Sequence, residues 1–249
     1  MAERTPDAAA PGTRAAETAA SENAAAEMEP TETRAAASWA AETARIIVES
    51  RALYARAGGD PFYFSSGWAS PVFIDCKKLI SAPRARDMLV AMAVACVAAG
   101  VDADALDAVA GCELTGVPFA ALIADRLDKP LVLACKQRKG FGRLAQFEGD
   151  FAPGARILLV DDLATDGASE SVFRDALRAA EAEVIATFVL IDFTVFPSDH
   201  AMLSLARLGD IVARAKADGA LGPRECAEIE TFDADAPAWS RAHGGIGGV

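Results

Sequence analysis

Two adjacent acids, Asp161 and Asp162, stand between a short apolar run and a loop of small residues. The run Ile157–Val160 has no polar break, which is typical of a strand buried on both faces of a parallel sheet. Ligands bind at the carboxyl ends of such strands. The backbone N–H groups of the loop, and of the helix expected from about Ser169 to Ala180, form a site for an anion. The segment therefore suits a sugar phosphate, with carboxylates for ribose hydroxyls and Mg²⁺ and amides for the phosphate.

Two other interpretations of this acid pair remain open on these residues alone. An ordinary strand-to-helix turn also uses small and hydroxyl residues, because they cap the helix. A receiver domain carries an acid pair as well. It needs that pair near its first strand, however, whereas Asp161 and Asp162 lie late in the chain.

The segment Lys136–Arg143 places four cations and two glycines in eight residues of an otherwise acidic protein. A solvated charge run is the simplest interpretation of such a cluster. Glycines also give the backbone freedom to move, and a mobile Lys-rich loop can close over the negative charges of a pyrophosphate group and exclude water. Next to the acid pair, this loop favours a pyrophosphate leaving group.

The elements that would position these residues alternate between strand and helix. Repeated strand–helix–strand units pack as a parallel sheet with helices on both faces, so we expect an α/β fold. The expected strands are Phe62–Phe64, Val72–Ile74, Leu106–Ala110, Leu131–Ala134, Arg156–Val160 and Val184–Ile191. The expected helices are Ser38–Ala57, Arg84–Ala99, Val117–Leu127 and, beyond Pro197, His200–Leu208, Asp210–Asp218 and Pro223–Glu228.

Residues 1–37 differ in composition from the rest of the chain. They are mostly Ala, Glu, Thr and Pro, without Leu, Ile, Val or an aromatic residue. Such a segment buries too little apolar surface to offset the entropy lost on ordering, so we expect a disordered tail before a domain spanning residues 38–249. The tail also lacks the apolar region of a signal peptide and the basic character of a transit peptide.

The charge and the cysteine content indicate which partners and which cellular compartment the protein is expected to have. A formal net charge of -12 disfavours nucleic acid as a partner. The apolar run Met88–Ala99 is too short to span a membrane and fits a buried helix. The five cysteines are scattered, which predicts neither a disulfide framework nor a zinc site. We therefore expect a protein of the reducing cytoplasm.

The strand, the acid pair, Thr165 and Gly167 resemble the 5-phosphoribosyl-1-pyrophosphate (PRPP) motif of type I phosphoribosyltransferases. Three further elements occur in the order typical of one family of that class, and with them the sequence resembles the orotate phosphoribosyltransferases from Ser38 to about Asp192. These elements are the Ser-Gly-x-x-Ser-Pro stretch within Phe64–Asp75, the pyrophosphate-side loop Ala110–Pro118, and the flexible loop, matched by Lys136, Lys139 and Gly142.

The resemblance implies a type I phosphoribosyltransferase fold, in which a central, mostly parallel sheet is flanked by helices and carries a small hood. It implies transfer of the ribose 5-phosphate group of PRPP to orotate, giving orotidine 5′-monophosphate (OMP) and pyrophosphate in pyrimidine biosynthesis. It also implies a homodimer, in which the loop Lys136–Arg143 of one subunit closes over the site of its neighbour.

The resemblance further assigns roles to single residues. Lys139, Asp161 and Asp162 would be catalytic, and Mg²⁺ would bind largely through PRPP. Orotate would lie beside Phe73, Ile74 and Thr165. The PRPP-binding residues would be Lys136, Lys139, Asp161, Asp162, Leu163, Ala164, Thr165, Asp166, Gly167, Ala168 and Ser169.

Some positions depart from the pattern of the family. Cys135 stands where the flexible loop commonly begins with an Arg that binds PRPP, and Phe193 stands where many members place an Arg for the orotate carboxylate. Ser65 and Thr115 replace lysines found in many members. Three functions therefore remain open: transfer to orotate, transfer to another base, and non-catalytic binding of PRPP or a nucleotide by a regulatory relative.

Overall fold

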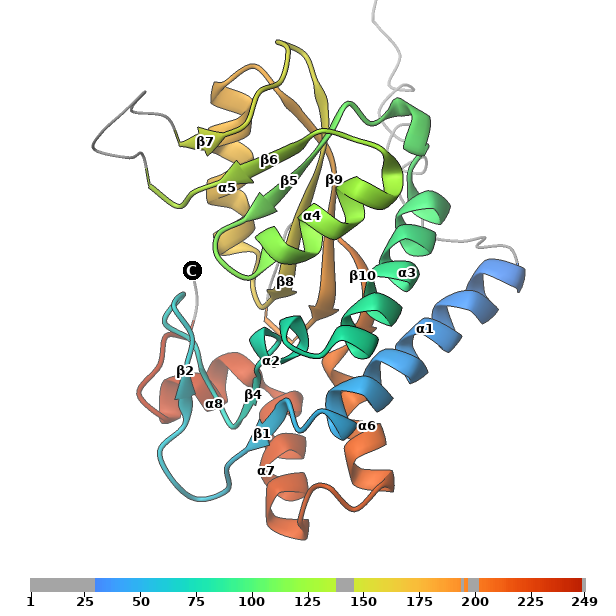
Figure 1. Cartoon of the computed structure of the whole chain (residues 1–249). Helices are drawn as coiled ribbons and strands as arrows, with labels where there is room; N and C mark the ends of the chain where they lie inside the picture. Colours follow the sequence, from blue (N-terminus) through green and yellow to red (C-terminus); the bar gives the residue numbers. More distant parts are fainter. Residues whose placement is uncertain (1–29, 138–145, 194, 197–201, 248–249) are drawn as a thin grey trace, which may run out of the picture. The chain divides into compact units, whose positions relative to one another are not determined.

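The computed structural model describes residues 30–137, 146–193, 195–196 and 202–247. Residue contacts divide the chain into two units, residues 1–35 and 36–249. The second unit is built on a six-stranded sheet with the order β10-β9-β8-β5-β6-β7 (Figure 1). All neighbours are parallel except β6 and β7. The strands are β5 (Ala108–Cys112), β6 (Leu131–Ala134), β7 (Phe147–Glu148), β8 (Arg156–Ala164), β9 (Glu183–Asp192) and β10 (Leu203–Arg207).

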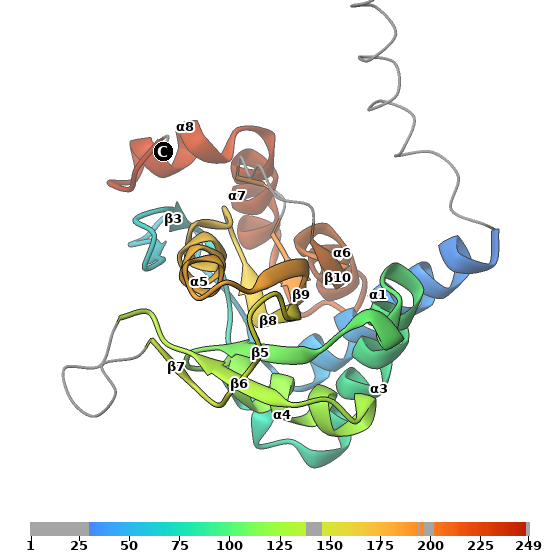
Figure 2. The ribbon, with the colours of Figure 1, turned by 90° about the horizontal axis from the view of Figure 1, so that it is seen from above.

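Helices cover both faces of this sheet, as the view in Figure 2 shows. Helix α5 (Ala168–Ala179) lies on one face, while α3 (Pro83–Gly100) and α4 (Gly116–Leu127) lie on the other. A short 3-10 helix, Ala103–Ala105, leads from α3 towards β5. The expected α/β fold with a mostly parallel sheet is confirmed.

Strand β8 shows why its sequence has no polar break. Leu158 and Val160 belong to the apolar cluster that also contains the buried residues of α3 and α4. Ile157 and Leu159 belong to the cluster on the opposite face, with Phe173 of α5. Because successive side chains of a strand point to opposite faces, a sheet covered on both sides needs an apolar residue at every position.

The smaller part of this unit contains two antiparallel strand pairs. Strand β1 (Leu53–Ala55) pairs with β4 (Val72–Ile74), and β2 (Phe62–Tyr63) pairs with β3 (Ala69–Ser70). We call these strands and their connections the hood. The carboxyl ends of β8 and β9 point towards this part in Figure 1. The remaining helices are α1 (Pro30–Glu49), α2 (Lys77–Ile80), α6 (Leu208–Ala217), α7 (Pro223–Ala234) and α8 (Ala236–Ala242).

The expected helix Ser38–Ala57 is wrong at both ends. Helix α1 begins at Pro30, so Ser38 lies inside it rather than at its cap, and it ends at Glu49. Arg51 has a left-handed φ of 52°, and the chain then continues as strand β1, which pairs with β4. Residues 30–37 of the predicted tail are thus helical; residues 1–29 lie outside the described residues, and their disorder stays a prediction.

The expected helix His200–Leu208 is also wrong, because residues 203–207 form β10. Leu203 and Leu205 are two residues apart, which suits a strand, and β10 extends the sheet parallel to β9. Three elements extend at least two residues beyond their predicted ends: β8 continues to Ala164, β5 continues to Cys112, and α7 continues to Ala234. Strands β3 and β7 and helices α2 and α8 were not predicted.

Across the described part of the chain, no helix has the length and apolar character needed to cross a membrane. The five cysteines are all described, and none of them forms a disulfide. Cys76, Cys96 and Cys112 are buried, while Cys135 and Cys226 are half-buried.

Candidate active site

The two acids lie at the carboxyl end of β8, where it runs between β5 and β9. Asp161 is only 8% exposed, and its Oδ1 accepts the backbone N–H of Asp162 at 2.9 Å. Burial, together with the charge of Asp162, raises the pKa of Asp161 well above its ordinary value. Burial also raises the pKa of Asp162, while the Lys77 ammonium opposes that rise. The pair therefore favours ligands that donate hydrogen bonds or bring positive charge.

Gly116 lets the start of α4 approach these acids closely. A Cβ atom at this position would lie 2.5 Å from the carbonyl oxygen of Val160 and 3.0 Å from the Cα of Asp161. Gly111 on β5 is equally confined, since its Cβ would lie 2.7 Å from the Cα of Val117. The two glycines explain how a helix and two strands come together directly beside the acid pair.

The loop after β8, which we call the phosphate loop, comprises residues 164–169. Its turn depends on Gly167, which has a φ of 78°, and α5 begins at the next residue. The Asp166 Oδ1 accepts the backbone N–H of Ala168 at 3.1 Å and the Thr165 hydroxyl at 3.3 Å. The expected order of strand, acid pair, small-residue loop and helix N-terminus is therefore present, and it has the form of an anion site.

A pocket of about 200 Å³ lies between the hood and the phosphate loop. It brings together residues from three segments that the sequence analysis singled out. They are Phe73 of β4, Thr165 and Ser169 of the phosphate loop, and Ser65. Ile74, expected beside orotate, has its side chain in the apolar core with 4% exposure. The lining residues are Tyr63, Phe64, Ser65, Ser66, Phe73, Leu163, Thr165, Ser169 and Glu170. We call this the hood pocket.

Glu170 is a residue of the hood pocket that the sequence analysis missed. It lies in the first turn of α5 and is only 2% exposed. Burial, followed by the charges of Asp166 and Asp162, raises its pKa to about 7. The sequence does show an acid in the first turn of the predicted helix, but that position is also common for a purely structural acid near a helix N-terminus.

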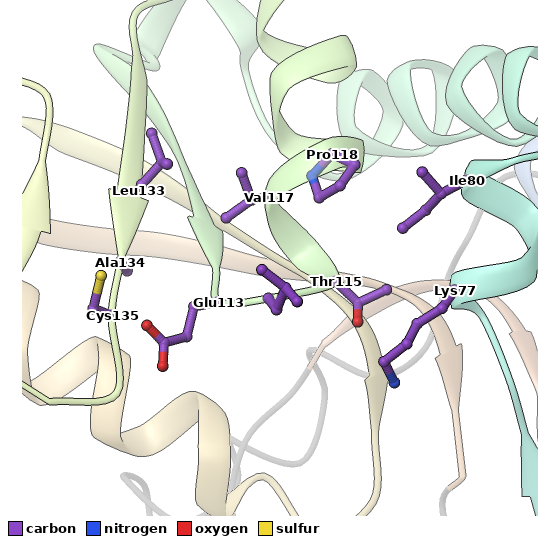
Figure 3. A pocket seen from close by; sticks show the side chains of 10 residues that line it. Lys77, Ile80, Glu113, Thr115, Val117, Pro118, Leu133, Ala134 and Cys135 are labelled. Carbon is purple, nitrogen blue, oxygen red and sulfur yellow. The ribbon is translucent and has the colours of Figure 1, made fainter.

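A second, larger pocket of about 570 Å³ lies between α2, the start of α4 and the end of β6. In Figure 3, Glu113 and Cys135 lie on one side of it, and Thr115 and Lys77 lie on the other. Its lining residues are Lys77, Ile80, Glu113, Leu114, Thr115, Val117, Pro118, Leu133, Ala134 and Cys135. We call this the α2 pocket. It contains most of the predicted pyrophosphate-side loop.

Lys77 is the second residue that the sequence analysis missed. It is the first residue of α2, it lies in the α2 pocket, and its ammonium acts electrostatically on Asp162. The sequence does contain a signal for Lys77, because this residue follows the predicted strand Val72–Ile74. That strand belongs to the Phe64–Asp75 stretch that resembles an element of the family. Lys136 is exposed at the end of the described segment, whereas Lys139 and Gly142 lie outside the described residues.

The departures from the family pattern fall into two environments. Cys135 and Thr115 line the α2 pocket, and Ser65 lines the hood pocket. Phe193 is fully buried and packs edge-on against Phe64, with ring centroids 5.5 Å apart. Phe193 therefore builds the apolar wall behind the hood and does not present a polar group to a ligand.

The chain is similar to known proteins of one family. The family model for the phosphoribosyl transferase domain matches residues 85–195. The orotate phosphoribosyltransferase of Dinoroseobacter shibae is 39% identical over 209 residues, which cover 81% of this chain and 92% of that protein. The protein of the same name from Rhizobium etli is 40% identical over 210 residues, which cover 82% of this chain and 91% of that protein.

Solved structures show the same relationship. The crystal structure of orotate phosphoribosyltransferase from Aeropyrum pernix is similar with a TM-score of 0.57 and 26% identity, covering 71% of this chain and 99% of that chain. The structure of Leishmania donovani UMP synthase is similar in fold with a TM-score of 0.64 and 23% identity, covering 78% of this chain and 42% of that chain.

Proposed function

The chain belongs to the orotate phosphoribosyltransferase family, and we propose that the hood pocket and the α2 pocket together form its active site. The reaction joins orotate to C1 of PRPP and releases pyrophosphate, giving OMP for pyrimidine biosynthesis. One observation carries the placement of the site. Phe73 and Thr165, which are far apart in the sequence, line one pocket directly beside the phosphate loop.

In this arrangement the base lies against the hood and the 5′-phosphate lies on the phosphate loop. Phe73 offers an aromatic face to the pyrimidine, and Thr165 approaches both the base and the phosphate. The backbone N–H groups of residues 165–169 and the N-terminus of α5 supply donors and a favourable dipole for the phosphate.

Asp161 and Asp162 lie where the ribose would join these two ends. Their oxygens can accept hydrogen bonds from ribose hydroxyls. The transition state of such a transfer has positive charge on the ribosyl ring, and the acid pair stabilises that charge in a buried setting. The raised pKa values of the two acids have the same origin, because a buried Asp161 beside a half-buried Asp162 is stabilised by any positive charge placed next to the pair.

The α2 pocket is the proposed place of the pyrophosphate group. Lys77 supplies a cation there, and Lys136 follows directly after Cys135 at its edge. We propose that Lys139 joins them when the loop closes, neutralises the leaving group and excludes water. This division assigns the two ends of PRPP to two different pockets.

We propose that Mg²⁺ reaches the site with PRPP. Within the described ranges, no three His, Cys, Asp or Glu side chains are grouped to hold a metal on their own. Magnesium is commonly held by one or two carboxylates together with substrate phosphates, and the Asp161–Asp162 pair fits that donor set. When bound, the ion would neutralise charge on the pyrophosphate group.

We further propose a homodimer in the cytoplasm, in which the Lys136–Arg143 loop serves the neighbouring subunit. The dimer follows from the resemblance of that loop to the flexible loop of the family. The reducing compartment is supported by five thiols that form no disulfide. The net charge of -12 disfavours a nucleic-acid partner, and small anionic substrates would be neutralised locally by the cations of the site.

The test is an assay of the purified protein with PRPP, Mg²⁺ and orotate, following the loss of orotate absorbance. We expect OMP formation that requires both PRPP and Mg²⁺, with uracil and adenine as poor acceptors. Binding of PRPP without turnover of any base would contradict the proposal, and turnover of uracil or adenine in preference to orotate would replace the acceptor.

A further inference from the structure

A hydrogen bond joins the hood to the phosphate loop. The indole Nε1–H of Trp68 donates to the Asp166 Oδ2 at 2.7 Å. Trp68 is fully buried, and its ring lies against Phe196 with centroids 4.3 Å apart. A buried indole N–H is destabilising unless it donates to an acceptor, and a carboxylate is a strong hydrogen-bond acceptor. The contact therefore holds Asp166 in one orientation.

The other carboxylate oxygen of Asp166 shapes the loop itself. Its Oδ1 accepts the N–H of Ala168 and the hydroxyl of Thr165, as described above. Asp166 is thus held from both sides, by the hood through Trp68 and by its own loop through Ala168. Because an acid beside a phosphate site repels the phosphate, the direction in which this carboxylate points matters for binding.

The short segment that carries Trp68 is fixed in turn by the C-terminal part of the chain. The Ser240 Oγ of α8 accepts the backbone N–H of Ala69 at 2.9 Å and donates to the carbonyl of Ile246 at 2.6 Å. The N–H of Ile246 donates to the carbonyl of Gly67 at 3.0 Å. Both neighbours of Trp68 are therefore anchored, so the indole has little freedom to leave Asp166.

We propose that Trp68 is a positioning residue for the phosphate loop: its indole N–H holds the Asp166 carboxylate away from the 5′-phosphate and keeps the loop amides directed at that group. This rests on the proposed function, in which the loop takes the 5′-phosphate. Without the indole N–H, the carboxylate keeps only its contacts within the loop. It is then free to turn towards the ligand, where its charge opposes binding.

The test compares two ligands that occupy different ends of the PRPP site, ribose 5-phosphate and magnesium pyrophosphate. In Trp68→Phe, which keeps an aromatic ring against Phe196, we expect the dissociation constant for ribose 5-phosphate to rise about tenfold. The constant for magnesium pyrophosphate stays within about twofold, since it binds in the α2 pocket. In an Asp166→Ala background, Trp68→Phe should have no further effect on either ligand.

Trp239→Phe is the matched control, because its indole Nε1–H also donates to a carboxylate, that of Glu228 at 2.9 Å, but away from the loop. We expect this variant to bind both ligands as the unmodified protein does. Equal weakening of both ligands by Trp68→Phe, or additive effects with Asp166→Ala, would overturn the proposal. If the unmodified protein bound neither ligand, the proposed function itself would fail instead.

Discussion

Four acidic side chains surround the phosphate loop, although the loop is proposed to take an anion. Their surroundings act on these acids in two different ways. Asp166 receives hydrogen bonds from Trp68 and Ala168. Asp161, Asp162 and Glu170 are held in environments that raise their pKa values. The loop is therefore proposed to accommodate a phosphate by offering its amides, while hydrogen bonds fix the Asp166 carboxylate and burial favours the neutral form of Glu170.

Glu170 is expected to make phosphate binding depend on pH. Its pKa of about 7 means that it is mostly protonated at pH 6 and mostly ionised at pH 8. The charged groups that act on it are Asp161, Asp162, Asp166 and Arg174. We expect the affinity for ribose 5-phosphate to be about tenfold lower in the unmodified protein than in Glu170→Gln at pH 8, and similar in both at pH 6.

The second ionisation of the phosphate, near pH 6, is common to both proteins, so the ratio of their dissociation constants isolates the effect of Glu170. Calorimetric titration at several pH values gives that ratio. A ratio that stays constant from pH 6 to pH 8 would show that Glu170 does not face the phosphate.

The same carboxyl affects stability, and the sign follows from the direction of its shift. The folded protein raises the pKa from 4.5 to about 7, so the associated stability is present below pH 4.5 and is lost as the pH rises through 7. Glu170→Gln should therefore unfold with a free energy up to about 3 kcal/mol higher than the unmodified protein at pH 8, and with little difference near pH 4.5. Urea unfolding at the two pH values measures this.

Cys135 gives a test of the α2 pocket. An Arg at this position would place a guanidinium in a pocket that we assign to pyrophosphate, and a charge-assisted hydrogen bond contributes about 1.5–3 kcal/mol. We expect Cys135→Arg to lower the KM for PRPP about tenfold or more. Cys226→Arg, at a half-buried cysteine of α7, is the control and should leave KM unchanged. An unchanged or higher KM in Cys135→Arg would remove the assignment of this pocket.

At the scale of elements, the site depends on how closely α4 approaches β8. Gly116 has no room for a side chain, because a Cβ would meet the backbone of Val160 at 2.5 Å. Gly209, in α6, has no atom within 4 Å of the same imagined Cβ. Gly116 and Gly209 both lie in helices, but only Gly209 has room for a side chain. Gly209 is therefore a suitable control for Gly116.

Gly116→Ala is expected to push α4 away from the acid pair. It should lower the free energy of unfolding by about 1–3 kcal/mol and reduce OMP formation, because Asp161 shifts with the helix. Gly209→Ala should leave the activity unchanged and the stability equal or higher by up to about 1 kcal/mol. Thermal unfolding and the orotate assay check both. Full activity in Gly116→Ala would contradict the tight packing that we describe.

Most of the sheet could be predicted from sequence, because buried parallel strands such as Arg156–Val160 carry an unbroken apolar pattern. The errors fell where local pattern and tertiary pairing compete. Leu53–Ala55 looked like the end of a helix until β4 supplied a partner strand, and Leu203–Arg207 became a strand through pairing with β9. Trp68 and Glu170 could not be predicted as site residues, because their roles arise from contacts with Asp166 and the hood.

At the scale of the whole molecule, the two pockets are proposed to hold the two ends of PRPP, and the acid pair lies at the carboxyl end of β8 between β5 and β9. This is the edge of a parallel sheet where ligands are expected to bind. The Lys136–Arg143 loop of each subunit is expected to complete the active site of the other subunit. We therefore propose that the fold supplies the binding surfaces and that a second subunit supplies the cations of the closing loop.

Hybrid dimers test that division. Lys139→Ala and Asp162→Asn should each be nearly inactive alone. If the loop crosses to the neighbouring subunit, each hybrid dimer has one intact site, and an equal, re-equilibrated mixture should recover about a quarter of the unmodified activity. If each loop serves its own subunit, the mixture recovers nothing. A protein that stays monomeric and active would contradict the dimer itself.

The most direct measurement is a crystal structure of this protein with OMP bound. We expect the pyrimidine in the hood pocket against Phe73, the ribose hydroxyls on Asp161 and Asp162, and the 5′-phosphate on the backbone amides of residues 165–169. OMP bound with its phosphate away from that loop, or with its base outside the hood pocket, would contradict the account.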